Sequence, residues 1–304
     1  MFRKPIFWTG FAVVSIACVF YSVRYFSQAF PLVTLDLKMD RETALQSAKE
    51  LAEKYDWGPA ECQQAASFGV DSEVQTYVEL EVGDTEAFSE MLAGDLYSPY
   101  TWQVRHFKEN ETNESRIRFT PAGKPYGFVE KLPEDAPGAS LQPDSARTIA
   151  ENAARTHWQI DFSAYQLVEA SQENRPGGRT DHTLVYERPN VKLGDDGQYR
   201  LRLTVSGDRF TELTHFVKIP EAFSRKYEEM RSANDTIAFG SVMAMGVIYI
   251  LGGCIIGLFF LLRQRWVIWR KPLFWGLFIA FLQFLAGMNQ LPLAWMGYDT
   301  ALSS

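Results

Sequence analysis

Four histidines are the side chains in this 304-residue sequence that best suit metal or acid–base chemistry. A zinc site needs three or four histidine, cysteine or carboxylate ligands brought together. The histidines lie far apart along the chain: His106, His157, His182 and His215. No G-x-S-x-G, H-E-x-x-H or phosphate-loop motif occurs. We therefore predict that the histidines are satisfied surface or sheet residues, and that this chain holds no catalytic residue, metal ligand or cofactor.

The three cysteines indicate packing rather than disulfide chemistry. Cys18 and Cys254 lie within long apolar runs, whereas Cys62 is alone in the polar part of the chain. A disulfide needs two cysteines that can approach each other, so none is expected within the polar part. The sequence predicts that Cys62 is a small buried apolar residue.

Three long apolar runs, none of which contains a charged residue, dominate the organisation of the chain: Ile6–Val23, Ile237–Leu262 and Leu273–Trp295. At about 1.5 Å per residue, a helix over the second run exceeds the roughly 30 Å apolar core of a bilayer. A buried core helix is the alternative for this run, and its length argues against that alternative. A cleavable signal peptide is the alternative for the first run, but the residues after Val23 form a poor cleavage site. We predict three transmembrane helices.

Basic residues indicate the orientation of these helices, because lysine and arginine concentrate on the cytosolic side of a membrane. Arg3 and Lys4 precede the first run, and four basic residues lie between the second and third runs, at 263, 265, 270 and 271. The sequence predicts a multi-pass protein of the cell membrane with a cytosolic N-terminus. Its predicted segments are a transmembrane anchor (1–27), an extracytoplasmic region (28–236), a transmembrane helix (237–262), a cytosolic turn (263–272), a transmembrane helix (273–296) and an external tail (297–304).

The extracytoplasmic region is acidic. Residues 28–236 contain 36 acidic and 23 basic residues, a net charge of −13. Such a charge repels nucleic acids and anionic lipid headgroups, so nucleic acid is excluded as a partner. The lipid bilayer remains as a partner, together with a peptide or protein bound by the extracytoplasmic domains.

Two successive units with the same order of elements fill this region, each a helix followed by strands. In the first domain, residues 28–137, Asp40 caps a helix whose apolar residues recur at helical spacing, and a short helix is expected at Thr85–Leu92. Alternation of apolar and polar residues predicts its strands, at Val74–Val82, Tyr100–Phe107, Ser115–Phe119 and Tyr126–Glu130.

In the second domain, residues 138–221, a helix opens at Pro143, and a linker near Pro133–Pro143 separates it from the first domain. Its predicted strands are Tyr165–Ser171, His182–Arg188, Tyr199–Ser206 and Phe210–Lys218. A juxtamembrane helix is expected at 222–236. The predicted fold class is α+β, with two tandem helix-plus-antiparallel-sheet domains outside the membrane and three transmembrane helices.

Several segments resemble the N-terminal part of bacterial CPBP-family intramembrane metalloproteases, which are related to the CAAX prenyl endopeptidases. The resemblance covers nearly the whole chain, and the two soluble units also resemble, more loosely, PepSY or cystatin-like folds. Its most specific segments are QAASFGVDSEVQTYVELE (64–81), SPYTW (98–102), RFTPAGKPYGFVEKLPEDAPGA (118–139), DHTLVYERP (181–189), ELTHFVKIPEAFSRKYEEMRSAN (212–234) and NQLPLAWMGYDTAL (289–302).

The resemblance implies, for full-length members of the family, proteolysis with a divalent metal such as zinc. The family carries Glu-Glu-x-x-x-Arg, Phe-x-x-x-His and His-x-x-x-Asn/Asp motifs on membrane helices. Here Glu228-Glu229 is followed by Ala233 in place of the arginine, and Phe-x-x-x-His does not occur. His106 and Asn110 match the third motif by spacing alone, in a polar loop. No catalytic residue is therefore transferred to this chain.

The sequence supports three hypotheses for function. The first is the membrane-anchored extracytoplasmic front end of a CPBP-family protease that lacks the catalytic helices. The second is a non-enzymatic membrane sensor or partner-binding protein with tandem PepSY-like domains, and the third is a subunit of an envelope complex. The reading frame after Ser304 discriminates between the first two, because further apolar spans with paired glutamates there would support the protease.

Overall fold

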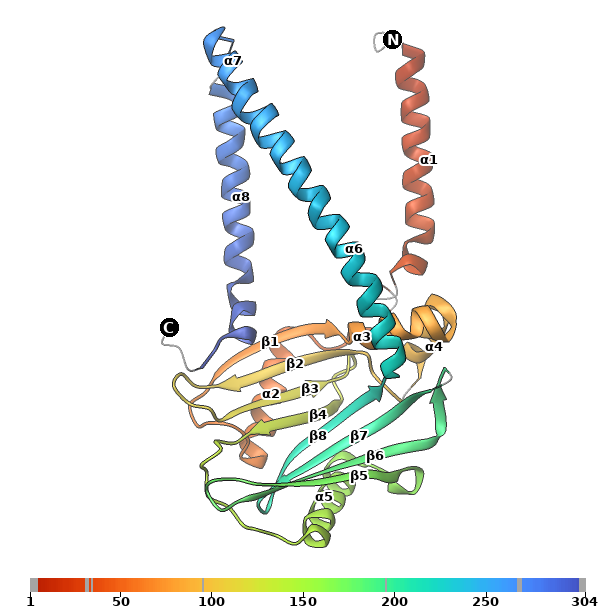
Figure 1. Cartoon of the computed structure of the whole chain (residues 1–304), viewed down its shortest axis with the longest axis vertical. Coiled ribbons are helices and arrows are strands. Elements are labelled where there is room, and N and C mark those ends of the chain that lie inside the picture. Colours follow the sequence, from red (N-terminus) through yellow and green to blue (C-terminus); the bar gives the residue numbers. More distant parts are fainter. Residues whose placement is uncertain are drawn as a thin grey trace. The chain divides into compact units, whose positions relative to one another are not determined.

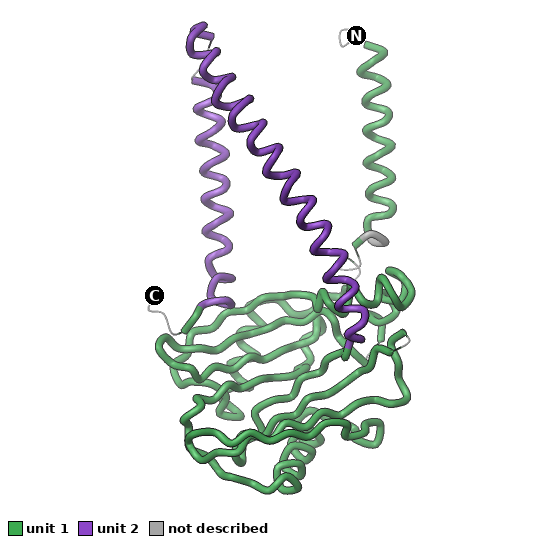
Figure 2. The backbone as a smooth tube through the Cα atoms, in the orientation of Figure 1, with its two compact units in different colours: residues 1–218, 299–304 green, residues 219–298 purple. Residues whose placement is uncertain are grey.

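The structure, a computed structural model, describes residues 5–300 except 31, 32, 34, 95, 195 and 267–269, and the side chains of 27–29 are also left out. Arg3, Lys4 and the last four residues of the predicted external tail thus lie outside the described residues. The chain forms two compact units, coloured separately in Figure 2. The sheet unit comprises Met1–Lys218 and Asp299–Ser304, and the helical unit comprises Ile219–Tyr298.

One antiparallel sheet of eight strands forms the centre of the sheet unit (Figure 1). The strand order is β1-β2-β3-β4-β8-β7-β6-β5. The strands are β1 (Gln63–Val70), β2 (Tyr100–Phe107), β3 (Glu114–Phe119), β4 (Pro125–Lys131), β5 (Gln166–Asn174), β6 (Thr180–Leu193), β7 (Gly197–Ser206) and β8 (Arg209–Lys218). The helices of this unit are α1 (Pro5–Ala29), α2 (Arg41–Tyr55), α3 (Ser72–Tyr77), η2 (Val78–Gly83), α4 (Asp84–Ala93), α5 (Pro143–Trp158) and η3 (Phe162–Ala164).

The predicted α+β class with antiparallel strands is confirmed, and the two halves of the sheet are joined at one seam. Each half is a long helix followed by four strands, and the last strands of the halves, β4 and β8, pair with each other. Phe128 lies opposite Leu213 in this pairing. A Cβ atom on Gly127 would lie 2.5 Å from the carbonyl oxygen of Leu213, so glycine is required for the strands to approach. Because both halves share one sheet, their separation into two domains stays a prediction.

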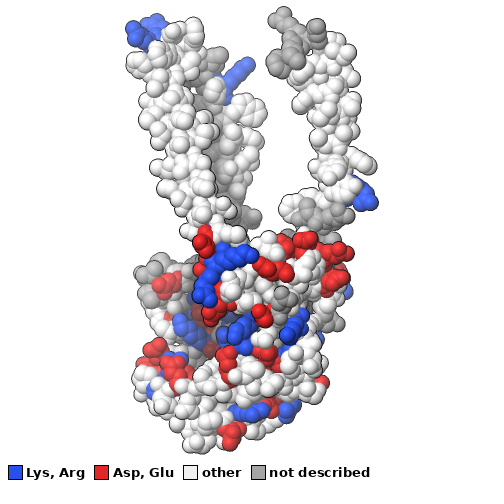
Figure 3. All heavy atoms as spheres, turned by 45° about the vertical axis from the view of Figure 1, so that its right-hand side comes forward, with Lys and Arg blue, Asp and Glu red and all other residues white. Residues whose placement is uncertain are grey.

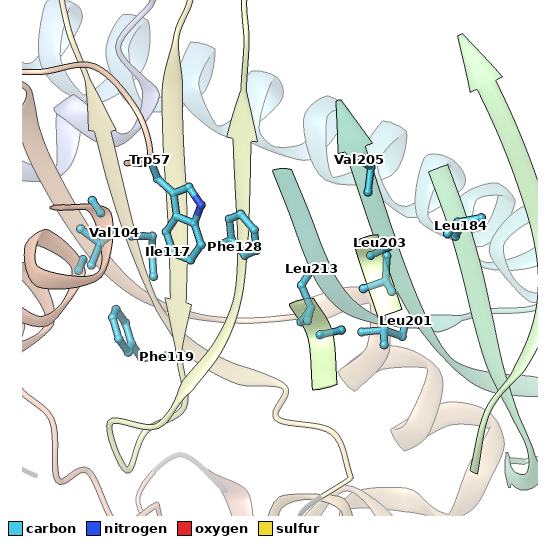
Figure 4. Packing of buried hydrophobic residues seen from close by; sticks show 14 of the residues in the cluster. Trp57, Val104, Ile117, Phe119, Phe128, Leu184, Leu201, Leu203, Val205 and Leu213 are labelled. Carbon is cyan, nitrogen blue, oxygen red and sulfur yellow. The ribbon is translucent and has the colours of Figure 1, made fainter. Parts of the chain in front are cut away.

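Alanines allow α2 and α5 to lie close to the sheet. In each helix the buried alanines recur every four residues, which keeps them on one face, as the sequence predicts: Ala44, Ala48, Ala52, Ala146, Ala150 and Ala154. The side chain of Asp40 accepts a hydrogen bond from Thr43 N at 2.8 Å and caps α2, which confirms that prediction. Larger apolar side chains from both halves of the sheet meet the alanines in one core, shown in Figure 4.

The strand predicted at Val74–Val82 is wrong, because this segment is helical. Asp71 accepts a hydrogen bond from Val74 N at 3.2 Å and caps α3, and η2 continues the helix to Gly83. Val74, Tyr77 and Val78 are all at most 3% exposed, and their spacing is that of one helix face. The apolar residues therefore follow a helical period, although the alternation in the sequence also fits a strand. The strand of this region is β1, just before it, which the sequence analysis missed.

The predicted linker between the halves is fixed to the sheet unit by a buried arginine. Arg179, 3% exposed, donates hydrogen bonds from Nη1 to the carbonyl oxygens of Pro133 and Ala136, at 3.1 and 3.2 Å. Its Nε atom donates to Asp181 at 2.8 Å. These contacts satisfy both the buried cation and the linker carbonyl groups. The connection is thus an ordered part of the sheet unit.

In the part of the chain that the structure describes, three helices are long and apolar enough to cross a membrane, consistent with membrane localisation: Pro5–Phe26, Glu221–Arg263 and Arg270–Gly297. The helical unit supplies two of them, and its elements are α6 (Glu221–Val247), the π-helical η4 (Ile248–Ile256), α7 (Gly257–Arg263), α8 (Arg270–Ala294) and η5 (Trp295–Gly297). The predicted juxtamembrane helix is therefore continuous with the helix that follows it. Figure 3 shows long stretches of these helices without charged side chains, whereas charges of both signs are scattered over the visible face of the rest of the sheet unit.

The predicted orientation gives a direct expectation for chemical labelling. In a variant without Cys18, Cys62 and Cys254, a cysteine at Asp208→Cys should react in intact cells with a membrane-impermeant thiol reagent. A cysteine at Gln264→Cys should react only after permeabilisation, because the basic residues around it favour the cytosol. Both positions are exposed. The reverse labelling pattern would invert the proposed topology.

Candidate functional site

A cavity of about 560 Å³ on the helix-covered side of the sheet unit is the strongest candidate for a functional site. We call it the tyrosine pocket, defined by Tyr97, Lys124, Tyr126, Tyr165, Arg188 and His215. Its volume lies in the usual range for small-molecule sites, and such sites combine aromatic walls with a few polar groups. Both halves of the sheet contribute residues to it.

The seam between β4 and β8 places two rings at the centre of this pocket. Tyr126 precedes Phe128 by two residues, and His215 follows Leu213 by two residues. Because Phe128 and Leu213 are paired in an antiparallel register, these two side chains lie opposite each other on the same face. Their rings stack, with centroids 4.6 Å apart and an interplanar angle of 18°. Tyr126 and His215 are both half-buried, so each also borders the cavity.

Burial keeps the His215 ring neutral. Loss of solvent, and secondarily the positive charges of Arg188, Lys124 and Arg118, lower the pKa of His215 to about 4. At neutral pH the ring therefore has one N–H donor and one acceptor nitrogen. A general base works best with a pKa near the operating pH, so His215 suits hydrogen bonding better than proton abstraction.

Hydrogen bonds fix the wall formed by the segment before β2. The Tyr97 hydroxyl donates to Asp71 Oδ2 at 2.7 Å, and the backbone N–H of Ser98 donates to the Tyr126 hydroxyl oxygen at 3.0 Å. Burial raises the pKa of Tyr97 and of Tyr126, and the nearby Asp71 carboxylate raises that of Tyr97 further. Both tyrosines are therefore protonated at neutral pH. The Tyr126 hydroxyl oxygen accepts the hydrogen bond from Ser98 N–H, so its own proton is available for donation to a ligand.

A cation lies against the third tyrosine. The Arg188 guanidinium is 5.1 Å from the centroid of the Tyr165 ring, within the range of a cation–π interaction. Lys124, in the turn before β4, is exposed and lines the same cavity. Among the described residues, two carboxylates also border the pocket, those of Asp36 and Asp161. The site thus combines aromatic surface, hydrogen-bond donors and charges of both signs.

A larger hollow of about 780 Å³ lies among charged residues that include Arg116, Arg175 and Glu212. Three of the four arginines that line it are paired with carboxylates: Arg175 and Arg179 each contact Asp181 at 2.8 Å, and Arg116 contacts Glu114 at 3.3 Å. Aromatic rings do not line it, so it lacks the mixed character of the tyrosine pocket. We therefore regard it as a solvated surface of the sheet.

The four histidines have separate surroundings, and only His215 borders the tyrosine pocket. His106 Nε2 is 2.9 Å from Gln64 Nε2, His182 Nε2 is 3.0 Å from Leu141 O, and His157 Nδ1 is 3.3 Å from the Tyr55 hydroxyl. Burial lowers the pKa of His106 to about 4. Within the described residues, no three histidine, cysteine, aspartate or glutamate side chains are grouped so that they could hold a metal.

The cysteines of the described chain are not paired with each other. Cys62, predicted to be buried, is half-buried, and desolvation raises the pKa of its thiol. A thiol with a raised pKa is a weaker nucleophile at neutral pH. This observation agrees with a packing role for Cys62.

Sequence reasoning missed the tyrosine pocket, although it placed three of the six defining residues, Tyr126, Arg188 and His215, in the correct strands. The predicted strands Tyr126–Glu130 and Phe210–Lys218 contain the two stacked rings. The missing information was the pairing of these strands, which brings Tyr126 beside His215. The signal present in the sequence was an aromatic residue in the last predicted strand of each repeated unit, Tyr126 in the first and His215 in the second.

Comparisons with known proteins do not establish a family. No family model matches the chain, and no curated protein matches it. Among solved structures, the Bacillus megaterium YpeB C-terminal domain is a distant neighbour, with 10% sequence identity and a TM-score of 0.32. The match covers 58% of this chain and 62% of that one, so the chain spans less than two thirds of its neighbour. The resemblance to CPBP-family proteases stays a prediction.

Proposed function

We propose that this chain is a membrane-anchored binding protein, and that the tyrosine pocket of its sheet unit is the ligand site. The observation that supports this proposal is the stack of Tyr126 and His215 on the wall of a half-enclosed cavity of about 560 Å³. Offset aromatic stacking of this kind offers a flat apolar surface to a third ring or to an apolar chain. The donors of Tyr126 and His215 lie at the same surface and would orient the ligand.

Binding fits the chemistry of the pocket better than catalysis does. Acid–base catalysis requires a group whose pKa lies near the operating pH. The pKa of His215 is lowered to about 4, and those of the three tyrosines are raised by burial. Among the described lining residues, the serine is Ser98, whose hydroxyl donates to Tyr100 O at 2.8 Å. The lining residues thus offer recognition groups rather than an activated nucleophile.

A second proposal comes from the sequence resemblance. The chain would be the front end of a CPBP-family intramembrane protease, with the tyrosine pocket as a site that recognises substrate or regulates the enzyme. The three helices of membrane length and the α+β sheet unit are compatible with this arrangement. Catalysis would then depend on helices encoded beyond Ser304, and the reading frame there tests this proposal directly.

Loss of the stacked rings should weaken ligand binding about tenfold for each ring. The probes are N-acetylated tripeptides Gly-Gly-Xaa, with aromatic, aliphatic or basic Xaa, titrated into the full chain in lipid nanodiscs by calorimetry. Tyr126→Ala and His215→Ala each remove a stacking surface whose contribution is about 1–1.5 kcal/mol. Tyr55→Ala removes a half-buried tyrosine outside the pocket and is the matched control.

The binding proposal fails if no tripeptide binds at millimolar concentration. It also fails if Tyr55→Ala weakens binding as much as Tyr126→Ala and His215→Ala do. Melting curves of all three variants are needed in parallel, because a folded variant that has lost binding is the informative result.

A further inference from the structure

Arginines in the sheet unit are usually neutralised by a carboxylate. Arg179 donates to Asp181 at 2.8 Å, and Arg200 donates to Glu187 at 2.8 Å. Arg209 lies 3.2 Å from the buried Glu130. Acidic residues outnumber basic residues in this part of the chain, so carboxylates are available to pair with the arginines. Several cations of this unit form no ion pair among the described residues, and those that line a cavity are the ones placed to bind an anionic ligand.

Arg188 and Lys124 are two such cations, and both line the tyrosine pocket. Among the described residues, neither side chain forms an ion pair with a carboxylate. Arg188 instead faces the ring of Tyr165. Of the described carboxylates that border the pocket, Asp36 contacts Lys38 Nζ at 3.1 Å, and Asp161 accepts a hydrogen bond from Ser163 N at 2.9 Å. The hydrogen bonds from Ser163, and the charges of Arg188 and Arg155, lower the pKa of Asp161, so Arg188 is near this carboxylate without forming an ion pair with it.

We propose that the tyrosine pocket recognises a carboxylate attached to an aromatic or apolar group. Arg188 and Lys124 bind the carboxylate, and the stack of Tyr126 and His215 holds the apolar group. A planar guanidinium matches the two oxygens of a carboxylate and forms paired, charge-assisted hydrogen bonds with them. This inference rests on the proposed function, because it names the ligand class of the same site.

The surroundings of the pocket favour a singly charged anion. The acidic sheet unit repels ligands that carry several negative charges, such as nucleotides and inorganic phosphate. A carboxylate has only one charge, and its apolar neighbour gains contact with the aromatic walls. Such a group occurs at the C-terminus of a peptide and in small aromatic or aliphatic acids, and the structure fits both sources.

The test compares acids with their amides, which differ only in the charge at one end. The full chain in lipid nanodiscs is titrated with N-acetylphenylalanine, with N-acetyl-Gly-Gly-Phe and with the C-terminal amide of each. We expect each acid to bind at least about tenfold more tightly than its amide, the usual effect of a charge-assisted hydrogen bond. Tighter binding of the tripeptide acid identifies peptide ends as the source, and tighter binding of the single residue identifies small acids.

Substitutions of Arg188 and Lys124 test whether these two cations bind the carboxylate of the ligand. Arg188→Gln and Lys124→Gln should each weaken binding of the acid about tenfold more than binding of the amide, which reduces the preference for acid over amide. Arg188→Lys keeps a cation and should retain part of the preference. Arg202→Gln is the matched control, because the Arg202 guanidinium also lies over a ring, that of Phe216 at 4.9 Å, away from the pocket.

Four results would overturn the inference, and the last of them would also overturn the proposed function. Equal binding of acids and amides would exclude carboxylate recognition and leave the binding function in place. Displacement of the acids by equimolar inorganic phosphate would show that any anion is accepted. A loss of preference in Arg202→Gln equal to that in Arg188→Gln would mean that overall charge, rather than the pocket, attracts the acids. Failure of every probe to bind would remove the proposed function as well.

Discussion

Replacing Phe128 by alanine should lower the free energy of unfolding of the sheet unit by about 4 kcal/mol, within the usual range for removal of a buried phenylalanine. Phe128 is 1% exposed and lies at the seam of the sheet. Its ring stacks on the rings of Trp57 and Trp158, with centroid distances of 3.9 and 5.5 Å. The ring of Phe210 packs edge-on, with its centroid 5.4 Å away. These rings come from different elements and cannot all collapse into the space that alanine leaves. Urea unfolding of the full chain in nanodiscs, followed by tryptophan fluorescence, measures the loss.

Phe216 offers a matched control for this substitution. The sequence repeat aligns it with Phe128, since both begin a Phe-Val-x-x segment near the end of their units. Phe216 is only half-buried, and the Arg202 guanidinium covers its ring. Phe216→Ala should therefore cost about 1 kcal/mol. Similar losses for the two variants would contradict the central role of the seam.

Acidification from pH 7.5 to 5 should destabilise the sheet unit, with roughly 2 kcal/mol coming from His106 alone. Burial lowers the pKa of His106 to about 4, against an ordinary value of 6.5. Between these two values the unfolded chain binds a proton that the folded chain excludes, so stability falls as the pH decreases. Above about pH 7 the ring is neutral in both states and the effect disappears. His215, whose pKa is also lowered to about 4, adds a loss of the same sign.

The change in stability between pH 7.5 and pH 5 reports mainly on histidines, since most carboxylates titrate below pH 5. His106→Gln should make the unfolding free energy less dependent on pH in this window, and His215→Gln should have a similar effect. Each variant is compared with itself at pH 7.5 and pH 5, so that any loss of packing cancels. An unchanged pH dependence in His106→Gln would show that this ring is not kept neutral by the fold.

Local patterns were sufficient to predict most elements of the sheet unit. The buried alanines of α2 and α5 are spaced at helical intervals, and Asp40 is a typical helix cap. The segment Val74–Val82 shows where such patterns fail, because its apolar residues fit both a strand and a helix. Asp71, which caps α3, was the local signal in favour of the helix.

The candidate site could not be predicted from the sequence, because it depends on the pairing of two strands that lie far apart along the chain. The tyrosine pocket exists because β4 pairs with β8, and that pairing depends on the close backbone approach at Gly127. A single glycine in a strand pattern is compatible with many structures, so it does not identify a seam. The neutral state of His215 is likewise a result of burial between the halves, which no local pattern encodes.

The pairing of β4 with β8 also sets the order in which the sheet is completed during synthesis. β4 ends at Lys131, whereas β8 begins only at Arg209. Because ribosomes add about 5–20 residues per second, roughly 4–16 s separate the appearance of the two strands. During that interval the backbone N–H and C=O groups along one side of β4 are open to any extended chain nearby. The nascent first half is therefore a target for chaperones and proteases until the second half emerges and covers this edge.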